Sequence, residues 1–506
     1  MVMSMKKIHD NFLEPPQQQL NSLLKYYQSG RYIDAEKLSL SITQEFPKNQ
    51  FAWKVLAVVL KQNGKINEAL IVSQKSVQLA PHDAEVHNNL GVLLQDQGRL
   101  DEAKKSHIKA IELKPDYAEA HNNLGNLLKK QGKLDQAETC YKKVLTLKPD
   151  YAKAHNNLGV LLKEQGRIKE AEVSYVQAIK LKPDYVEAHY NLGVLLQDLE
   201  RLDEAEASYN NAIALKPDFT DALQNRWMIL FGKKRYEAAL KDADLITSKS
   251  NRALDLITLY ALGGLEEIYK RIETHSKIDG ENLDIAAFAA FIGKSEQKPT
   301  AYNFCPSPMD FIHVSNISSH LGNSTEFLAE VISELNNIKT IWEPHGRTAR
   351  KGFVTDKKFN LFANSSGSLA QLKSIIFDEI DTYYSKFQKE SCSYIKKWPS
   401  KIFLCGWHVV LKKQGYNTVH IHPTGWLSGV IYLKVVPALE KNEGAIEFSL
   451  NGQNYQHKNS PSLIFQPKVG DIVFFPSSLH HRTIPFTTDT DRIIVSFDLM
   501  PEASER

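Results

Sequence analysis

Three histidines and one arginine near the end of the chain have residue types and spacing suited to a metal site. His420 and His422 lie two residues apart in TVHIHPTGWLSGVIYL, His481 follows in FPSSLHHRTIPF, and Arg492 opens the apolar run RIIVSFDL. Alternate residues of a β-strand point to the same side, so His420 and His422 are expected to face together with Thr418. A third imidazole from a later strand, His481, completes a set that can hold a metal ion.

Arg492 indicates what binds beside that metal. It lies eleven residues after His481, at the start of a predicted strand. Its planar guanidinium group matches a carboxylate in two parallel hydrogen bonds. The four residues therefore predict a metal site with a carboxylate-bearing cosubstrate next to it.

The order and spacing of these residues resemble the Fe(II)- and 2-oxoglutarate-dependent dioxygenases. From Trp407 through Phe497 the chain is similar, more narrowly, to a bacterial and phage family of 2-oxoglutarate oxygenases related to the prolyl hydroxylases. That family carries an HxHP segment, then SGVxYL, then FPSxLxH, and finally a strand led by arginine. The resemblance implies Fe(II) and 2-oxoglutarate as cofactors and hydroxylation as the reaction. It implies iron at His420 and His481, and 2-oxoglutarate near Arg492, Tyr432 and Ser496.

The chain departs from the usual pattern of these enzymes at His422. An acidic ligand normally stands two residues after the first histidine, where this chain has His422. We favour a site of three histidines, completed by His420 and His481, which has one negative charge fewer and binds iron less tightly. Two histidines with an open position form the second possibility, and a carboxylate from Glu447 is the third. The motif FPSxLxH selects His481 as the distal ligand and lets His480 face outward.

The segments around these residues predict a β-domain closed by a helix. From about residue 302, short runs rich in β-branched and aromatic residues alternate with turns, as in KIFLCGWHVVLKK, TVHIH, DIVFFP and RIIVSFDL. Eight such runs favour a double-stranded β-helix, or jelly roll, over residues 301–502. One helix is evident at about 367–390, after a Ser/Gly signal for a helix start.

The first half of the chain predicts an α-helical solenoid. Seven units repeat every 34 residues, each with two helical segments, as in AEVHNNLGVLLQDQGRL and DEAKKSHIKAIELKPDY. The period and its small-residue positions resemble the tetratricopeptide repeat. A glycine closes the first helix of a unit, an alanine lets the two helices approach, and a proline ends the second. We place the solenoid at 14–250 and a helical cap or linker at 251–300. The recurring alanines are Ala35, Ala69, Ala103, Ala137, Ala171, Ala205 and Ala239.

Asparagines recur with the same period and predict a ladder on one face of the solenoid. The ladder resembles the repeats of the O-linked N-acetylglucosamine transferases, in which such asparagines hold peptide backbone. One interpretation is that the amides bind an extended segment of a protein or peptide partner. The other is that they tie neighbouring helices together. The histidines two residues earlier are expected to pack helices. The asparagines are Asn89, Asn123, Asn157, Asn191 and Asn225.

Composition limits the remaining possibilities. The chain has 506 residues, which favours several domains, and a formal net charge of +3, which gives no general attraction for nucleic acid. Its four cysteines show no close pairing, so a reducing, cytoplasmic environment is expected. No stretch approaches the roughly 20 apolar residues that cross a bilayer, so no membrane association is expected.

Together these features predict a multidomain α + β protein that is an enzyme. The favoured function is a 2-oxoglutarate- and Fe(II)-dependent dioxygenase that hydroxylates a protein or peptide recruited by the repeats. A non-catalytic scaffold for protein–protein interaction, with a degenerate oxygenase domain, is the alternative. A glycosyltransferase is suggested only by the repeats and ranks last, because the C-terminal part is short and rich in β-structure.

Overall fold

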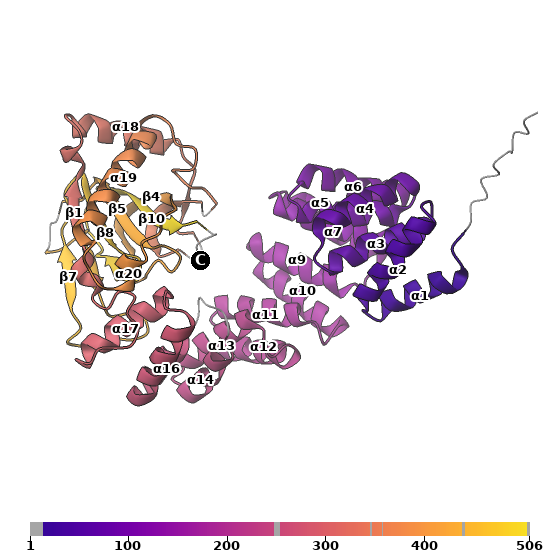
Figure 1. Ribbon diagram of the computed structural model, residues 1–506, viewed down its shortest axis with the longest axis horizontal. Coiled ribbons are helices and arrows are strands. Elements are labelled where there is room, and N and C mark those ends of the chain that lie inside the picture. Colours follow the sequence, from indigo (N-terminus) through magenta and orange to yellow (C-terminus); the bar gives the residue numbers. More distant parts are fainter. Residues whose placement is uncertain (1–13, 247–252, 345–346, 357, 438–440, 503–506) are drawn as a thin grey trace, which may run out of the picture. The chain divides into compact units, whose positions relative to one another are not determined.

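The computed structural model describes residues 14–246, 253–344, 347–356, 358–437 and 441–502. The chain divides between Ala222 and Leu223 into two compact units, and each is described by itself. The described part of the first unit is helical, whereas the second combines helices with all the described β-strands (Figure 1). A helical solenoid is thus followed by an antiparallel β-structure, as the sequence predicts.

From α1 to α12 the helices pack in pairs, and each pair contacts the next. Odd-numbered helices of neighbouring repeats also contact one another, as α5 does α7 and α9 does α11, which places them on the inner side of the curve. The pairs are α1 (Gln17–Gln28) with α2 (Tyr32–Glu45), α3 (Gln50–Gln62) with α4 (Ile66–Leu79), α5 (Ala84–Asp96) with α6 (Leu100–Leu113), α7 (Ala118–Lys130) with α8 (Leu134–Leu147), α9 (Ala152–Glu164) with α10 (Ile168–Leu181), and α11 (Val186–Asp198) with α12 (Leu202–Leu215). Helices α13 (Thr220–Gly232) and α14 (Tyr236–Leu245) follow in the same order along the chain.

Small residues of the period set both the turns and the helix contacts. The seven recurring alanines are all fully buried, so no larger side chain separates the paired helices there. The turn glycines have φ between 71° and 77°, a left-handed conformation that glycine adopts without strain. In the last two units the period has Glu200 and Lys234 at this point, and both keep the turn with φ of 59°. The turn glycines are Gly30, Gly64, Gly98, Gly132 and Gly166.

A second set of glycines makes room for a ring between paired helices. A Cβ added to any of them would lie 2.6 Å from an atom of that ring. The ring belongs to a tyrosine in three repeats and to a histidine in one, His107, which is fully buried. The pairs are Gly91 with His107, Gly125 with Tyr141, Gly159 with Tyr175, and Gly193 with Tyr209.

We expect His107→Tyr to make the solenoid less sensitive to acid. Burial lowers the pKa of His107 to about 4, so between pH 6.5 and 4 the unfolded chain binds a proton that the folded chain does not. The free energy of unfolding therefore falls as the pH drops through this window and is unaffected above it. The contribution of His107 at pH 5 is at most about 2 kcal/mol.

Urea unfolding of the full chain, followed by circular dichroism at pH 7 and pH 5, measures this difference. The reciprocal variant Tyr141→His is the matched control and should increase the loss of stability at pH 5. If the free energy of unfolding fell equally between pH 7 and pH 5 in the wild type and in His107→Tyr, His107 would not be the source of the acid sensitivity.

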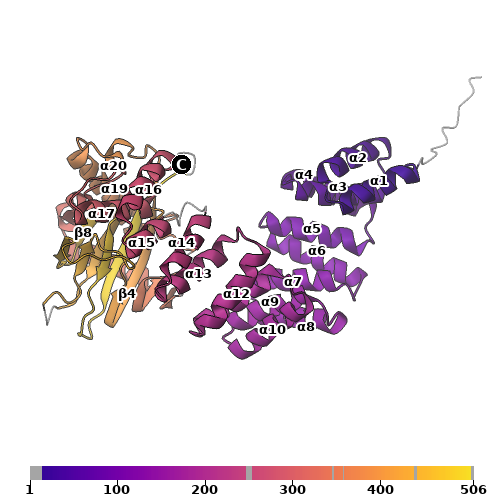
Figure 2. The same cartoon turned by 90° about the horizontal axis from the view of Figure 1, so that it is seen from below.

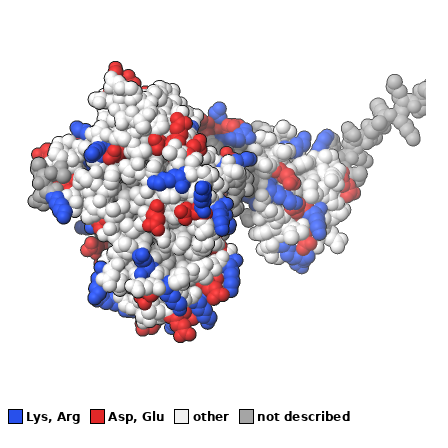
Figure 3. Space-filling view, turned by 60° about the vertical axis from the view of Figure 1, so that its left-hand side comes forward, with Lys and Arg blue, Asp and Glu red and all other residues white. Residues whose placement is uncertain are grey.

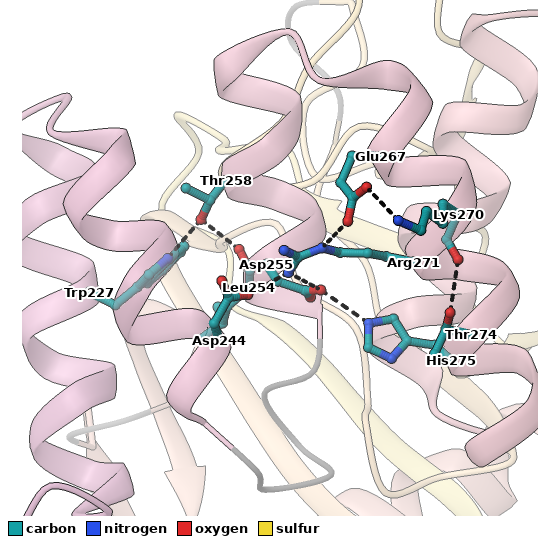
Figure 4. A network of polar contacts seen from close by, with 10 residues as sticks. All are labelled: Trp227, Asp244, Leu254, Asp255, Thr258, Glu267, Lys270, Arg271, Thr274 and His275. Atoms are coloured by element: carbon teal, nitrogen blue, oxygen red, sulfur yellow. Dashed lines mark hydrogen bonds and ion pairs between the residues drawn. The ribbon is translucent and has the colours of Figure 1, made fainter.

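Helices α15 (Ala253–Leu262), α16 (Leu265–Ile278) and α17 (Leu283–Ser295) precede the β-domain. A network of polar contacts joins α15 to α16 (Figure 4). Asp255 on α15 accepts hydrogen bonds from Arg271, at 3.2 Å, and from His275, at 3.1 Å, both on α16. Asp255 is 6% exposed, and removing it would take one of three carboxylates from Arg271, which also pairs with Asp244 and Glu267, and would leave His275 without this acceptor. The network therefore fixes the angle between α15 and α16.

Helix α17 joins this helical segment to the β-domain. Its Phe288 and Phe291 pack against Tyr455, with ring centres 5.0 and 4.7 Å apart. All three residues are at most 5% exposed and belong to one continuous core. The segment after α14 therefore shares its core with the β-domain.

The β-domain consists of two antiparallel sheets. The larger has the order β1-β8-β5-β10-β4-β3-β2, and the smaller has the order β7-β6-β9. The strands are β1 (His313–Asn316), β2 (Thr340–Trp342), β3 (Ala349–Thr355), β4 (Ile402–Asn417), β5 (Leu427–Lys434), β6 (Ile446–Ser449), β7 (Ser462–Phe465), β8 (Asp471–Pro476), β9 (His480–Thr483) and β10 (Arg492–Pro501). The helices are α18 (Ser324–Asn336), α19 (Gly367–Phe387) and α20 (Ser393–Lys396), with 3-10 turns at Pro308–Phe311 and Ile317–Ser319.

The two faces of the larger sheet have different roles. On β8, Phe474 points toward Tyr383 of α19, with ring centres 5.9 Å apart, so α19 covers the outer face (Figures 1 and 2). The next residue, Phe475, points the other way and lies 4.5 Å from the ring of His481. On the outer face of β5, Gly429 lies directly against the ring of Phe497. A Cβ at position 429 would lie only 2.2 Å from that ring, so a larger residue would displace it. The inner face is left for the space between the sheets.

The sequence did not predict every element of this domain. The run TVHIH is not a strand but makes a single bridge, between His420 and His481, before a turn at Pro423. The sequence analysis also did not predict helix α18 or the strands β1, β2 and β3, which all precede the first strand-like run, KIFLCGWHVVLKK. All described strand pairs are antiparallel, so the described residues contain no parallel nucleotide-binding sheet of the kind that the glycosyltransferase interpretation requires.

Charges of both signs are scattered over the described surface. Lys and Arg side chains are interspersed with Asp and Glu on the face shown in Figure 3. Many of them pair, as Arg201 does with Glu172 at 2.8 Å and with Glu204 at 2.6 Å. Among the described residues, no helix has the length and apolar character needed to span a bilayer.

Candidate metal and cosubstrate site

A cavity of about 410 Å³ lies between the two sheets and contains the three predicted histidines. Its walls come from β3, β4, β5 and β10 of the larger sheet, and from β6 and β9 of the smaller. Every second residue of β10 lines it, as the period of a strand requires. These residues are Arg492, Ile494, Ser496, Asp498 and Met500.

The three imidazoles form a compact cluster in this cavity. One ligand nitrogen from each of His420, His422 and His481 can be chosen so that all lie within 4.8 Å of one another. The ring centres of His420 and His481 are 4.3 Å apart, and those of His422 and His481 are 5.0 Å apart. Neutral imidazoles at this separation can share one transition-metal ion.

Hydrogen bonds to the outer nitrogen of each ring fix how the rings face inward. His420 Nδ1 lies 2.7 Å from the carbonyl of Thr418, and His481 Nδ1 lies 3.1 Å from the carbonyl of Leu479. Because a carbonyl only accepts, both Nδ1 atoms carry the proton and donate it. This leaves Nε2 of each ring as a lone-pair donor, which is the state that binds a metal.

Burial keeps two of these imidazoles uncharged. Burial, with smaller contributions from neighbouring His422 and His480, lowers the pKa of His420 to about 3. Burial and the nearby His420 and His422 hold the pKa of His481 well below its usual range. Both rings are therefore neutral at pH 7 and available as ligands, since metal binding requires deprotonated imidazole.

His422 is held by a carboxylate that the sequence interpretation missed. Its Nδ1 donates to Asp498 Oδ1 at 2.6 Å, and Ser428 Oγ lies 2.7 Å from the same oxygen. Ser428 Oγ also lies 2.8 Å from Ser477 Oγ. Asp498 is 7% exposed. A carboxylate behind a ligand histidine orients the ring and raises its basicity. The sequence contained the information needed to find Asp498, because it follows Ser496 by two residues in the same strand and therefore points to the same inward side.

A second polar group lies where the cosubstrate was expected. The guanidinium carbon of Arg492 lies 5.0 Å from the ring centre of Tyr432. Arg492 is 1% exposed and Tyr432 is fully buried. Neither Arg492 Nη1 nor Tyr432 Oη has a hydrogen-bond partner among the described residues. Buried donors without partners are rare and suit an anion that fills the cavity beside them. Ser496 lines the same cavity.

The structure does not bring Glu447 or His480 to the cluster. Glu447 lies on β6 opposite Arg482 and accepts from its Nε at 2.6 Å. The neighbours of Glu447 on β6, Ile446 and Phe448, face the interior, so Glu447 faces away. His480 also points away from the cavity, but it is buried, and its ring centre lies 5.7 Å from that of Tyr455. Tyr455 was not anticipated as its partner.

Three of the five predicted asparagines bond to the preceding repeat. The Nδ2 groups of Asn123, Asn157 and Asn191 donate to the Oδ1 atoms of Asn88, Asn122 and Asn156, at 3.0 to 3.1 Å. Asn89 lines a small hollow between α3 and α5. Asn225 lies on α13, which continues the series of odd-numbered helices. These hydrogen bonds tie neighbouring helices together. The Oδ1 atoms of Asn123, Asn157 and Asn191 themselves accept no side-chain hydrogen bond from the described residues.

The histidines that accompany the asparagines pack helices. Each places Nε2 within hydrogen-bond distance, 2.9 to 3.0 Å, of the carbonyl of the proline six residues earlier. The bond joins the start of each odd-numbered helix to the end of the helix before it. The pairs are His87 with Pro81, His121 with Pro115, His155 with Pro149, and His189 with Pro183.

We expect Asp498→Asn to weaken metal binding without unfolding the domain. The neutral amide still accepts from His422 but removes the negative charge behind the ring, so affinity should fall about tenfold, and Asp498→Ala should lower it about a hundredfold. Calorimetric titration of the chain with Fe(II) under anaerobic conditions, or with Mn(II), measures this.

Asp471→Asn is the matched control, because that carboxylate is equally buried, at 7% exposed, but lies on β8 outside the cavity. Equal metal affinity in the Asp498 variants and the wild type would show that Asp498 does not support His422.

Three family models match parts of the chain. Residues 406–498 match the model described as "Putative 2OG-Fe(II) oxygenase". Residues 93–132, 125–166 and 161–200 match the model "TPR repeat", and residues 186–219 match "Tetratricopeptide repeat". No curated protein matches the chain.

Several solved structures resemble the repeat part. The pilF protein of Pseudomonas aeruginosa is 20% identical, with a TM-score of 0.36, over 41% of this chain and 96% of its own. A tetratricopeptide repeat protein from Parabacteroides merdae is 17% identical, with a TM-score of 0.40, over 48% of this chain and 98% of its own. YrrB, described as a TPR protein with an unusual peptide-binding site, is 22% identical, with a TM-score of 0.29, over 37% of this chain and 96% of its own.

Proposed function

We propose that this chain, which joins tetratricopeptide repeats to a 2OG-Fe(II) oxygenase domain, is a dioxygenase that hydroxylates a protein or peptide substrate. The observation that carries the proposal is the cluster of His420, His422 and His481 in one cavity with Arg492 and Tyr432. Arg492 Nε donates to the carbonyl of Gly444 at 3.2 Å, whereas Arg492 Nη1 and Tyr432 Oη have no hydrogen-bond partner among the described residues. A group of metal-binding residues and a group of anion-binding residues in one cavity are what a metal with a keto-acid cosubstrate requires.

The three histidines would hold Fe(II) through their Nε2 atoms. Their Nδ1 atoms are engaged by Thr418, Asp498 and Leu479, so each ring has one inward nitrogen to offer. Of the three arrangements that the sequence left open, this donor set supports the three-histidine site. Glu447 supports the third arrangement poorly, because its carboxylate is paired with Arg482 on the other face of β6.

Arg492 and Tyr432 would hold the distal carboxylate of 2-oxoglutarate. A guanidinium group donates to both oxygens of a carboxylate, and the phenol adds a third donor. Burial lowers the pKa of Arg492, but arginine titrates so far above neutrality that the group stays cationic at pH 7. An anion that enters this end of the cavity therefore neutralises a charge that would otherwise stay buried and unpaired.

When bound, Fe(II) and 2-oxoglutarate supply the oxidation of a substrate C–H bond by dioxygen, with succinate and carbon dioxide as by-products. The protein supplies position and exclusion of water. Apolar side chains such as Val430, Ile446 and Ile494 line the same cavity as the histidines and Arg492, and each is buried. They keep the anion close to the metal and limit competing solvent.

The repeats would present a partner to this domain. Odd-numbered helices line the inner side of the curve and carry the asparagine series. Because Nδ2 of Asn123, Asn157 and Asn191 already donates between repeats, the amide oxygens are the groups left to accept from the backbone N–H groups of an extended peptide. We place the protein in the cytoplasm, since its four cysteines are free thiols.

The wild-type chain is expected to convert 2-oxoglutarate to succinate in a manner that depends on oxygen and Fe(II). His481→Ala should abolish metal binding and turnover. His480→Ala is its matched control, because the neighbouring ring faces Tyr455 and should leave both intact. Arg492→Gln should raise the KM for 2-oxoglutarate at least about tenfold, since it removes charge-assisted hydrogen bonds, without changing metal affinity.

His422→Asp separates a working three-histidine site from a weakened one. A loss of turnover would support three histidines as the functional set, whereas a gain would show that the carboxylate had been needed. Failure of the wild type to bind Fe(II) or Mn(II), with partner binding by the repeats retained, would favour the non-catalytic scaffold instead.

A further inference from the structure

A second arginine, Arg347, lines the cavity and has no anionic partner. It lies two residues before β3 and is half-buried. Its guanidinium carbon is 5.8 Å from the ring centre of Trp407. Its Nε is buried without a hydrogen-bond partner, and among the described residues it forms no ion pair. Within the described part of the chain, the guanidinium of Arg347 thus has a cation–π contact with Trp407 and no ion pair.

Arg347 lies by a different stretch of the cavity wall from Arg492. Arg492 is next to Tyr432, which pairs with Ile494 of β10. Trp407, under Arg347, pairs with Ser496 further along β10, and its ring centre lies 5.4 Å from that of His422. If Arg492 holds the cosubstrate as proposed, Arg347 is a second cation of the cavity to which no ligand has been assigned.

The surroundings of Arg347 do not neutralise it. Burial lowers the pKa of its guanidinium, against weaker opposing effects of Cys405, Asp356 and Asp498. Asp498 is already engaged by His422 and Ser428, and no carboxylate lies within ion-pair distance of Arg347 among the described residues. Partial burial of a cation without an anionic partner costs free energy. A ligand that places an anion beside Arg347 offsets this cost and is bound more tightly for that reason.

We propose that Arg347 binds a carboxylate of the substrate, so that the segment hydroxylated is an acidic one, with an aspartate or glutamate side chain at this position. The inference rests on the proposed function and names its substrate class. A single guanidinium with Asp356 and Asp498 in its neighbourhood suits a monoanion better than a phosphate dianion. Trp407 lies under Arg347, and Phe359 and Met500 line the same cavity, so apolar surface is available for the aliphatic part of such a side chain.

The experiment uses the full chain loaded with Mn(II) and 2-oxoglutarate, and N-acetylated, C-amidated tripeptides as probes. The central residue is Asp, Glu, Asn, Lys or phosphoserine, between two glycines. Broadening of peptide proton resonances by the bound Mn(II) gives the affinity and reports closeness to the metal. We expect the Asp or Glu peptide to bind at least tenfold more tightly than the Asn peptide.

Arg347→Gln should remove this preference, and Arg347→Glu should shift it toward the Lys peptide. Neither change should alter the affinity for Mn(II) or for 2-oxoglutarate. Arg482→Gln is the control, because it removes a cation that pairs with Glu447 on the other face of β6. The same preference for acidic peptides in wild type and Arg347→Gln would overturn the proposal, as would tighter binding of the phosphoserine peptide than of the Asp and Glu peptides.

Failure of this inference is distinguishable from failure of the proposed function. If Mn(II) and 2-oxoglutarate bind but acidic and neutral peptides bind alike, only the role of Arg347 is wrong. If the metal does not bind, calorimetric titration of the metal-free chain with the Asp and Asn peptides still tests the contact. Equal affinities for those two peptides in that titration would overturn the role of Arg347 as well.

Discussion

A single backbone pairing holds the candidate site together. His420 and His481 exchange two hydrogen bonds, from the N–H of His420 to the carbonyl of His481 at 3.2 Å and in return at 3.0 Å. The two residues come from segments about sixty positions apart in the chain. Because a pair bonded in this way brings the two Cα atoms to about 5.5 Å, their side chains must meet over the same space. His422 is then positioned by its own N–H, which donates to the carbonyl of Ser477 at 2.9 Å.

The parts of the molecule that follow a local period could be predicted from the sequence. The 34-residue repeat specifies helix pairs because the same small residue recurs at every close approach, and all seven alanines are buried accordingly. The histidines and Arg492 were recognisable because their order along the chain is distinctive. Asp498 could also have been found, since it shares the inward face of β10 with Arg492 and Ser496.

Other features depend on tertiary contacts that no local pattern carries. TVHIH has the composition of a strand, yet it makes only one bridge, because the turn at Pro423 leads the chain away from β9. Glu447 has a carboxylate at a plausible distance in sequence, but the pleat of β6 and the pairing with Arg482 turn it outward. Arg347 could not be assigned to the cavity, since its place depends on how the segment before β3 meets Trp407.

Two turns of the solenoid have a further consequence for its stability. Glu200 and Lys234 adopt the left-handed conformation that glycine has in the earlier units, and each costs about 1 kcal/mol relative to glycine. In a linear array, each unit is stabilised by its own contacts and by those with its neighbours. A strained turn therefore lowers the stability of its own unit rather than that of the whole array. The two turns are therefore local weak points that are not equivalent: Trp227 and Ala239 of the helix pair around Lys234 belong to the core shared with the β-domain, which offsets the cost there, whereas the pair around Glu200 contributes Leu195 to a core within the repeats.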